Sequence, residues 1–115
     1  MAVTIYHNPR CSKSRETLEL IRGKGIEPKV VLYLETPPDH ATLDRLLKSM
    51  GREPREAMRT KEAPYKELGL ADPALSRKAL IEAMVSHPVL IERPIVVNGA
   101  RAAMGRPPEA VLAIL

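Results

Sequence analysis

Ile5-Tyr6-His7-Asn8-Pro9-Arg10-Cys11-Ser12-Lys13-Ser14-Arg15 is the stretch around which the rest of the chain is expected to fold. A β-like run from Val3 to Tyr6 leads into a polar turn, and the turn brings Cys11 to the expected start of a helix. The unpaired N–H groups and partial positive charge of a helix N-terminus stabilise a thiolate and bind anions. The polar and basic neighbours favour partial exposure of Cys11 over burial as a small hydrophobe. This stretch therefore predicts an ionised thiol beside an anionic ligand.

The composition is that of an ordinary globular protein with one domain over residues 1–115. Hydrophobic residues make up 44% of the 115 residues and charged residues 28%, which suits one core in a chain too short for two. Cys11 is the single cysteine, so an intramolecular disulfide and a cysteine-rich zinc site are excluded, and a reducing, cytoplasmic compartment is expected. The first residues do not resemble a signal peptide, and no apolar run is long enough to span a membrane.

Two features argue against a nucleic-acid partner. Aromatic residues make up 3% of the chain, all of them tyrosine, and provide few platforms for base stacking. The formal net charge is +4, but the basic residues are spread along the chain instead of forming one basic face. The charge alone leaves open whether these residues only solvate the surface or steer an anionic substrate.

A strand–helix–strand unit is expected at the start of the chain. Apolar positions recur at helical spacing from about Ser12, with Leu18 and Ile21 on one face, and Gly23 marks the helix end. Residues 29–34 then form a continuous apolar run, which is the pattern of a buried parallel strand. Together these elements predict a right-handed βαβ unit.

A block of helices is expected over residues 37–87. Thr36 is the predicted N-cap of the first long helix, with Pro37 in its first turn. The apolar stripe of this helix consists of Leu43, Leu46, Leu47 and Met50. Short helices are expected at 54–58 and 64–68. Ser76 is the predicted N-cap of a last helix in this block, which ends before His87 because a proline follows.

The chain is then expected to return to β structure. Residues 95–97 are apolar and β-branched, Asn98-Gly99 is a strong hairpin signal, and residues 100–104 provide the return strand. A final helix is predicted from Gly105 onward. The complete order predicts an α/β, thioredoxin-like fold whose mixed four-stranded sheet has a βαβ half and a β-hairpin half.

Arg93-Pro94 lies just before the hairpin strand. In thioredoxin-like sheets a cis-proline at this place packs against the active-site cysteine. Pro94 is therefore predicted to be cis, although few X–Pro bonds are, and Arg93 is then predicted to be aimed at Cys11.

Several separated segments, in order over nearly the whole chain, form a pattern more specific than any one motif. The segments are Ile5-Tyr6-His7-Asn8-Pro9 with Cys11, Tyr33-Leu34-Glu35-Thr36-Pro37-Pro38, Met58-Arg59, Pro64-Tyr65-Lys66-Glu67-Leu68-Gly69-Leu70, His87-Pro88, Arg93-Pro94-Ile95-Val96-Val97 and Gly105-Arg106-Pro107-Pro108. This pattern resembles the glutaredoxin-coupled arsenate reductase (ArsC) family.

The resemblance implies that Cys11 is the nucleophile and that Arg59, Arg93 and Arg106 hold the oxyanion. It further implies that the Cys11 thiolate attacks arsenate, glutathione attacks the arsenic of the adduct, and glutaredoxin reduces the mixed species, so that arsenite leaves. Glutathione is the implied reductant, and no metal or organic cofactor is expected to be bound. The planar donor fork of arginine suits tetrahedral oxyanions, and a lone cysteine needs a resolving thiol from outside.

His7 and Ser14 are further candidates for the catalytic site because they lie close to Cys11 in the sequence. A His7 imidazolium would stabilise the thiolate, and the Ser14 hydroxyl would donate a hydrogen bond to it. The alternative for Ser14, a hydrogen bond back to its own helix, stays equally open.

The chain departs from the family pattern around the cysteine. Members typically carry Cys-Gly-Thr-Ser-Arg, whereas this chain has Ser12 and Lys13 after the cysteine, and Arg10 replaces a small residue before it. These departures are similar to those of a sister, YfgD-like branch, for which arsenate as substrate is not implied.

Two alternatives of other classes stay open. The first is a thiol oxidoreductase acting on another substrate. The second is a regulator similar to the Spx-type proteins that bind RNA polymerase, although Ser14 stands where many of those proteins have the second cysteine of a switch. A phosphatase-like Cys-x5-Arg loop is excluded because Thr17 occupies the arginine position.

Overall fold

The computed structural model describes residues 2–115, so Met1 of the expected domain 1–115 lies outside the described residues. Contacts divide the chain into two compact units. The first unit combines the two ends of the chain, up to Thr36 and from Arg93 onward, and the second unit spans Pro37–Glu92. That these units act as a single domain stays a prediction.

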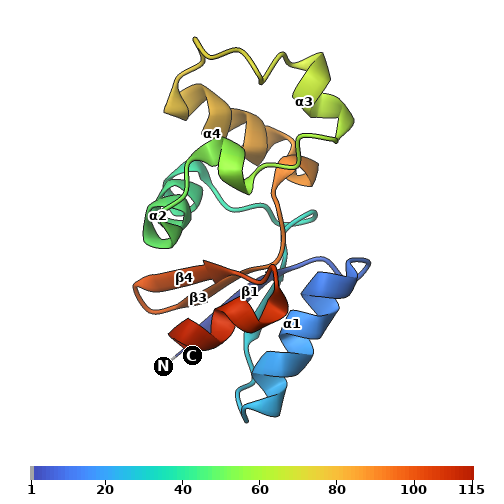
Figure 1. Cartoon of the computed structure of the whole chain (residues 1–115), viewed down its shortest axis with the longest axis vertical. Coiled ribbons are helices and arrows are strands. Elements are labelled where there is room, and N and C mark those ends of the chain that lie inside the picture. The colour runs from blue at the N-terminus through green and yellow to red at the C-terminus, as the bar shows by residue number, and fades with distance from the viewer. Residues whose placement is uncertain (1) are drawn as a thin grey trace. The chain divides into compact units, whose positions relative to one another are not determined.

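A mixed four-stranded sheet is the centre of the first unit (Figure 1). Its strands are β1 (Val3–His7), β2 (Lys29–Leu32), β3 (Ile95–Asn98) and β4 (Arg101–Met104), in the order β2-β1-β3-β4. β1 pairs with β2 in parallel and with β3 antiparallel, and β3 and β4 form an antiparallel hairpin. This arrangement confirms the predicted α/β, thioredoxin-like sheet with a βαβ half and a hairpin half.

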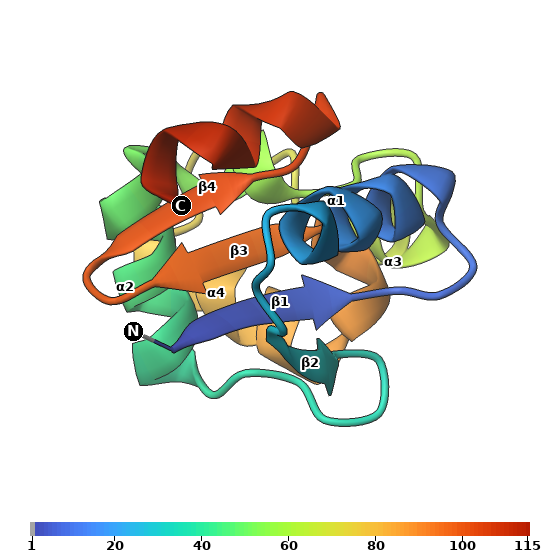
Figure 2. The same ribbon diagram turned by 90° about the horizontal axis from the view of Figure 1, so that it is seen from below.

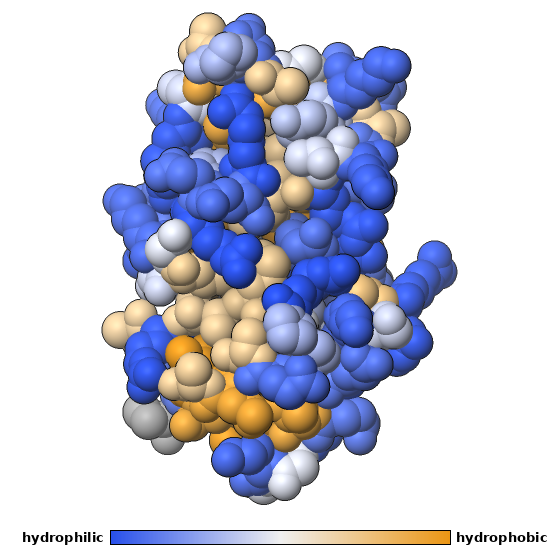
Figure 3. Space-filling view, in the orientation of Figure 1, coloured by the Kyte–Doolittle hydropathy of each residue, from blue (hydrophilic) through white to orange (hydrophobic). Residues whose placement is uncertain are grey.

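Two helices cover one face of this sheet. They are α1 (Ser12–Gly23) and the 3-10 helix η3 (Pro108–Ile114), which lie side by side (Figure 2). The sheet and the helices bury an aliphatic core made of Val3, Ile5, Leu18, Ile21, Val96, Val111 and Ile114. Leu20, Ile26 and Leu115 are partly buried against this core. Figure 3 shows that apolar side chains also gather in one patch at the surface of the molecule.

β2 corrects the prediction of a buried strand over residues 29–34. The strand ends at Leu32. Its end residues are exposed and its two valines are only half-buried, because β2 forms the edge of the sheet, with β1 as its single neighbour. Beyond it, the Leu32 carbonyl accepts hydrogen bonds from the N–H groups of Glu35 and Thr36, at 2.9 and 2.8 Å. This turn buries Tyr33 and leaves Leu34 outside.

The hairpin differs from its prediction by one residue. Asn98 pairs with Arg101, so the two loop residues are Gly99 and Ala100. Gly99 has a φ of 63°, and a positive φ at the first loop position matches a type II′ turn. Asn98 stays in β3 because its buried side chain donates a hydrogen bond of 2.6 Å from Nδ2 to the Ile114 carbonyl.

The second unit is helical. It contains α2 (His40–Met50), the 3-10 helix η1 (Pro54–Ala57), α3 (Ala63–Glu67), α4 (Arg77–Ser86) and the 3-10 helix η2 (Pro88–Leu90). The expected stripe of α2 is confirmed, since Leu43, Leu46 and Leu47 are buried. Ser76 is confirmed as the N-cap of α4. None of the helices formed by residues 2–115 has the length and apolar character needed to cross a bilayer.

The N-cap of α2 corrects the prediction for Thr36. Asp39 is the N-cap, and its carboxylate accepts a hydrogen bond of 2.8 Å from the Thr42 N–H. A proline disfavours helical geometry in the residue before it, so Pro38 keeps Pro37 out of the helix. The chain can start the helix only after Pro38.

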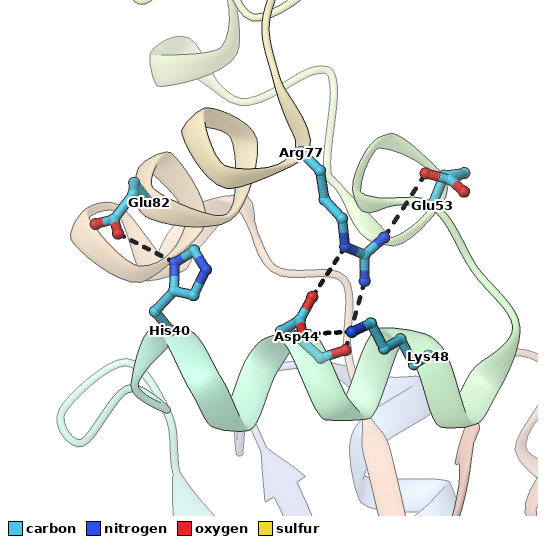
Figure 4. Close-up of polar contacts among 6 residues, drawn as sticks. All are labelled: His40, Asp44, Lys48, Glu53, Arg77 and Glu82. Carbon is cyan, nitrogen blue, oxygen red and sulfur yellow. Dashed lines mark hydrogen bonds and ion pairs between the residues drawn. The ribbon is translucent and has the colours of Figure 1, made fainter.

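Ion pairs join α2 and α4 on the surface of this unit (Figure 4). Arg77 Nε lies 2.9 Å from the Asp44 carboxylate and Arg77 Nη1 lies 3.7 Å from Glu53. Lys48 adds a second cation 3.0 Å from Asp44. The hydrogen bonds from Arg77 and Lys48 lower the pKa of the Asp44 carboxyl below its ordinary value.

Candidate active site

Cys11 is the N-cap residue of α1, as the sequence predicts. Its N–H donates to the Asn8 carbonyl at 3.0 Å, and its own carbonyl accepts from the Arg15 N–H at 3.0 Å. The prediction of partial exposure is wrong, because the side chain of Cys11 is buried, with 8% of its surface exposed. The tight turn points Pro9 and Arg10 into solvent and turns the cysteine inward.

Arg106 is the cation that lies at the cysteine sulfur. Its Nη1 lies 4.0 Å from Cys11 Sγ, although the two residues are 95 positions apart in the sequence. The same nitrogen donates a hydrogen bond of 3.2 Å to the Arg93 carbonyl, which orients the guanidinium. This position also lets the guanidinium contact an anion held beside the sulfur.

The segment that carries Arg106 is held against α1 where Gly105, Pro94 and Thr17 meet closely. The Gly105 N–H donates to the Pro94 carbonyl at 2.9 Å, and the Thr17 hydroxyl lies 3.5 Å from the Gly105 carbonyl. A Cβ added at Gly105 would lie 2.5 Å from Thr17 Oγ1 and 2.8 Å from Pro94 Cγ. No side chain larger than hydrogen therefore fits here, and the close approach brings Arg106 to Cys11.

The Arg93-Pro94 peptide bond is cis, which confirms the prediction. A second cis bond, between Arg106 and Pro107, was not predicted. Both cis prolines directly follow an arginine that the sequence predicts to bind the oxyanion.

His7 and Ser14 form a buried polar pair next to Cys11 in the chain. His7 Nδ1 lies 2.6 Å from Ser14 Oγ, and the Asn8 N–H donates to the same hydroxyl oxygen at 3.0 Å. Ser14 is therefore not the residue that bonds back to its helix; Thr17 does so, with its hydroxyl 2.7 Å from the Lys13 carbonyl.

Burial lowers the pKa of His7, and the nearby charges of Arg22 and Arg15 lower it further. This direction corrects the expectation of a His7 imidazolium, because a lowered pKa favours neutral imidazole at neutral pH. In the neutral form His7 orients the Ser14 hydroxyl and, through it, the Asn8 turn.

The three arginines predicted to bind the oxyanion differ in their contacts with Cys11. Arg106 lies at the sulfur, and Arg93, which is partly buried, contributes its carbonyl to the position of Arg106. Arg59 belongs to the second unit, where its guanidinium lies 3.3 Å from Glu62 and 3.8 Å from Glu92. The backbone N–H of Arg59 donates to the Leu90 carbonyl at 2.7 Å.

Three residues of this site were not among the predicted catalytic or oxyanion-binding residues, although Asn8 was expected to order the loop. Asn8 accepts the Cys11 N–H, Thr17 contacts the segment before Arg106, and Gly105 allows that contact. Thr17 carried a usable signal, because it shares the helical face of Ser14, Leu18 and Ile21 and is buried with them. Within residues 2–115, no group of three or more His, Cys, Asp or Glu side chains is arranged to hold a metal ion.

Comparison with known proteins identifies relatives that match nearly the whole chain. The model of the ArsC family matches residues 6–114. The chain is 64% identical to the uncharacterized protein YfgD of Escherichia coli, over 98% of this chain and 96% of that protein. It is 50% identical to an arsenate reductase of Rhizobium meliloti, over 100% of this chain and 82% of that protein. The solved structure of an arsenate reductase from Vibrio cholerae matches with a TM-score of 0.96 and 58% identity, covering 100% of this chain and 98% of that chain.

Proposed function

The chain belongs to the ArsC family, and from this premise we propose that it reduces arsenate to arsenite, with glutathione as the reductant and glutaredoxin as the partner. Cys11 is the nucleophile. The observation that carries the proposal is the placement of a buried thiol 4.0 Å from the Arg106 guanidinium, at the start of a helix. A reductant thiol and a lone unpaired cysteine both fit a reducing, cytoplasmic compartment.

The reaction begins with attack of the Cys11 thiolate on arsenic, which forms a sulfur–arsenic bond and releases one arsenate oxygen as water after protonation. The glutathione thiolate then forms a second sulfur–arsenic bond and displaces a second oxygen as water. A glutaredoxin thiolate attacks the glutathione sulfur, giving a mixed disulfide. The two electrons of the sulfur–arsenic bond that breaks stay on arsenic, which becomes As(III), and water releases it as arsenite from Cys11.

The arginines stabilise the negative charge of the oxyanion and of the leaving oxygen. Arg106 binds the oxyanion directly at Cys11. Arg93, whose carbonyl accepts a hydrogen bond from Arg106, is the second arginine that binds the oxyanion. Arg59 is the third arginine of the proposal on the strength of family resemblance. The fixed donors of a guanidinium suit this task because they need no reorganisation when the charge develops.

Ser14 and His7 support the nucleophile. The single hydroxyl proton of Ser14 serves either His7 Nδ1, at 2.6 Å, or an acceptor on the Cys11 side. When Nδ1 carries the proton of a neutral His7, the Ser14 proton is free to be donated to the thiolate. His7 and Ser14 thereby favour the nucleophilic form without a charged imidazole.

The proposal is tested by arsenite formation from arsenate with glutathione and glutaredoxin. Wild-type protein is expected to turn over, and Cys11→Ser is expected to be inactive. Arg106→Gln is expected to lower kcat about 100-fold, the loss typical of a missing oxyanion donor. Arg101→Gln is the matched control, because Arg101 donates to the Ala113 carbonyl and makes no contact with the cysteine.

The outcome separates the proposed substrate from the proposed site. Absence of arsenite, with Cys11 still rapidly alkylated at neutral pH, contradicts arsenate as the substrate and favours a thiol oxidoreductase for another substrate. Equal activity of wild type and Cys11→Ser contradicts the site itself. Capture of RNA polymerase by inactive protein would favour the regulator.

A further inference from the structure

A cavity lies at the carboxyl ends of the two parallel strands, and His7 is the one lining residue to which the proposed mechanism gives a role. It has a volume of about 270 Å³ and is bounded by residues 7–10 on one side and by Leu32, Leu34 and Glu35 on the other. His7 and Leu32 are the last paired residues of β1 and β2, so the cavity begins where the parallel ladder ends. The carboxyl ends of parallel strands are the usual binding edge of α/β sheets.

One wall of this cavity is the turn that presents Cys11. The Asn8 side chain accepts the Arg10 N–H at 3.0 Å, and the Asn8 carbonyl accepts the Cys11 N–H at 3.0 Å. Ser14 Oγ holds the same turn from the helix side. A molecule in the cavity therefore contacts a wall whose position is tied to the cysteine.

The opposite wall exposes apolar surface that the first unit does not cover. Leu32 is 37% exposed and Leu34 is 47% exposed. The hydrogen bonds that hold the turn after β2 keep Leu34 outside. Burial of such side chains against a ligand is favourable.

The rim of the cavity carries one charge of each sign. Arg10 and Glu35 both line it, and neither side chain forms an ion pair with another residue of the range 2–115. A ligand with both a carboxylate and an ammonium group is complementary to this rim, whereas an inorganic oxyanion would be repelled by Glu35.

We propose that this cavity binds glutathione, with Arg10 holding a carboxylate and Glu35 the ammonium group of the tripeptide. The inference rests on the proposed function, in which glutathione is the reductant. Leu32 and Leu34 cover the apolar part of the tripeptide. Glutathione is small enough for this site, since an adjoining cavity of about 370 Å³ that shares Leu32 and Glu35 provides room for the remainder.

The geometry also suits delivery of the thiol. Arg10 is covalently joined to Cys11, and consecutive Cα atoms are about 3.8 Å apart. The cysteine of glutathione is joined directly to the glycine that carries one of the two carboxylates, so this carboxylate lies about 5 Å from the cysteine Cα in an extended chain. A carboxylate held by Arg10 thus leaves the thiol within reach of an adduct on Cys11. The family typically has a small residue at position 10, so recognition by Arg10 is specific to chains like this one.

The test measures binding of S-methylglutathione, which has no free thiol, to the whole isotope-labelled protein by NMR titration. The expected result is a set of chemical-shift changes at residues 7–10 and 32–35. Arg10→Gln and Glu35→Gln are each expected to raise the dissociation constant about fivefold. Glu19→Gln, on the exposed surface of α1, and Lys24→Gln, at the exposed C-cap of the same helix, are matched controls and are expected to bind as wild type does.

Two results would overturn the inference. One is absence of binding, or shifts confined to other residues. The other is that glutaredoxin, but not S-methylglutathione, shifts residues 32–35, which would assign the surface to a protein partner. Because this titration uses no arsenate, failure of the proposed reductase activity leaves it interpretable. Conversely, arsenate reduction with an unchanged KM for glutathione in both variants would remove this inference alone.

Discussion

Replacing Gly105 with alanine should separate the packing of the site from its chemistry. The added Cβ would lie 2.5 Å from Thr17 Oγ1, 2.8 Å from Pro94 Cγ and 3.0 Å from Thr17 Cγ2. Carbon atoms in contact are normally about 3.5–4.0 Å apart. The two carbon neighbours must therefore retreat by roughly 0.5–1.2 Å, as judged from that contact distance.

Neither neighbour can retreat by itself. Thr17 is β-branched, buried in α1 and bonded to the Lys13 carbonyl, and the ring of Pro94 is rigid. Overpacking of this kind costs about 2 kcal/mol. For a chain of this length such a loss lowers Tm by about 8 °C.

The displacement has a second consequence, because Arg106 follows directly. Moving Gly105 away from α1 pulls the Arg106 guanidinium from its position 4.0 Å from Cys11 Sγ. Gly105→Ala should therefore also slow alkylation of Cys11 by iodoacetamide at neutral pH. Calorimetry gives the Tm, and mass spectrometry gives the alkylation rate.

Gly23→Ala is the matched control. A Cβ at Gly23 meets no atom within 4 Å, so this change should leave both quantities near their wild-type values or raise Tm slightly. The reasoning is refuted if Gly105→Ala matches Gly23→Ala in both Tm and alkylation rate.

Three further predictions concern titration and capping. The His7 imidazole should titrate in NMR below the ordinary value of about 6.5, and wild type should lose stability relative to His7→Asn as pH falls below that value, because the folded state resists protonation. Arg77→Met should raise the NMR titration midpoint of Asp44 and lower the urea midpoint at neutral pH, an effect that should disappear as the pH falls through the lowered pKa of this carboxyl and protonates it. Asp39→Ala should lower the urea midpoint by removing the N-cap of α2, whereas Thr36→Ala should leave it unchanged.

Each of these predictions has a clear contrary result. A His7 midpoint at or above the ordinary histidine value would show that burial does not control its charge. The control for Arg77→Met is Lys78→Met, which removes an adjacent exposed cation and should change the urea midpoint little. Equal losses of the urea midpoint in both variants would contradict the role assigned to the Arg77–Asp44 ion pair. A larger loss in Thr36→Ala than in Asp39→Ala would restore the cap that the sequence predicts.

The fold was predictable because its local signals agree with its tertiary arrangement. The strands, α1 and the hairpin follow from apolar periodicity and from the glycine at position 99. The exposure of β2 was not predictable from the sequence. A continuous apolar run is equally compatible with a buried strand and with an edge strand whose outer side chains contact water or a ligand. The N-cap of α2 was missed because Pro38 overrides the favourable cap residue Thr36.

The candidate site was predictable in its residue types and less so in its contacts. The thiol of Cys11 and the guanidinium of Arg106 can be recognised as candidate groups from residue type alone. The short distance between them follows once the fold is known. The burial of Cys11 depends on the direction of a turn, and the neutral state of His7 depends on desolvation, neither of which local sequence reports. The close approach at Gly105 joins residues 88 positions apart along the chain, as measured between Thr17 and Gly105, and no spacing rule reaches that far.

The first unit is assembled from both ends of the polypeptide, and this has a consequence for its synthesis. β1 is made early, but its antiparallel neighbour β3, and the helix η3 that completes its core, belong to residues 93–115 and leave the ribosome after the whole second unit. While the second unit is being translated, one edge of β1 lacks a partner and the apolar side of α1 lacks part of its cover. Arg106 also emerges after the second unit, so until then the nascent chain carries a cysteine without the cation that lies beside it in the folded protein. The pairing of Cys11 with Arg106 is thus formed only after the whole second unit has been made.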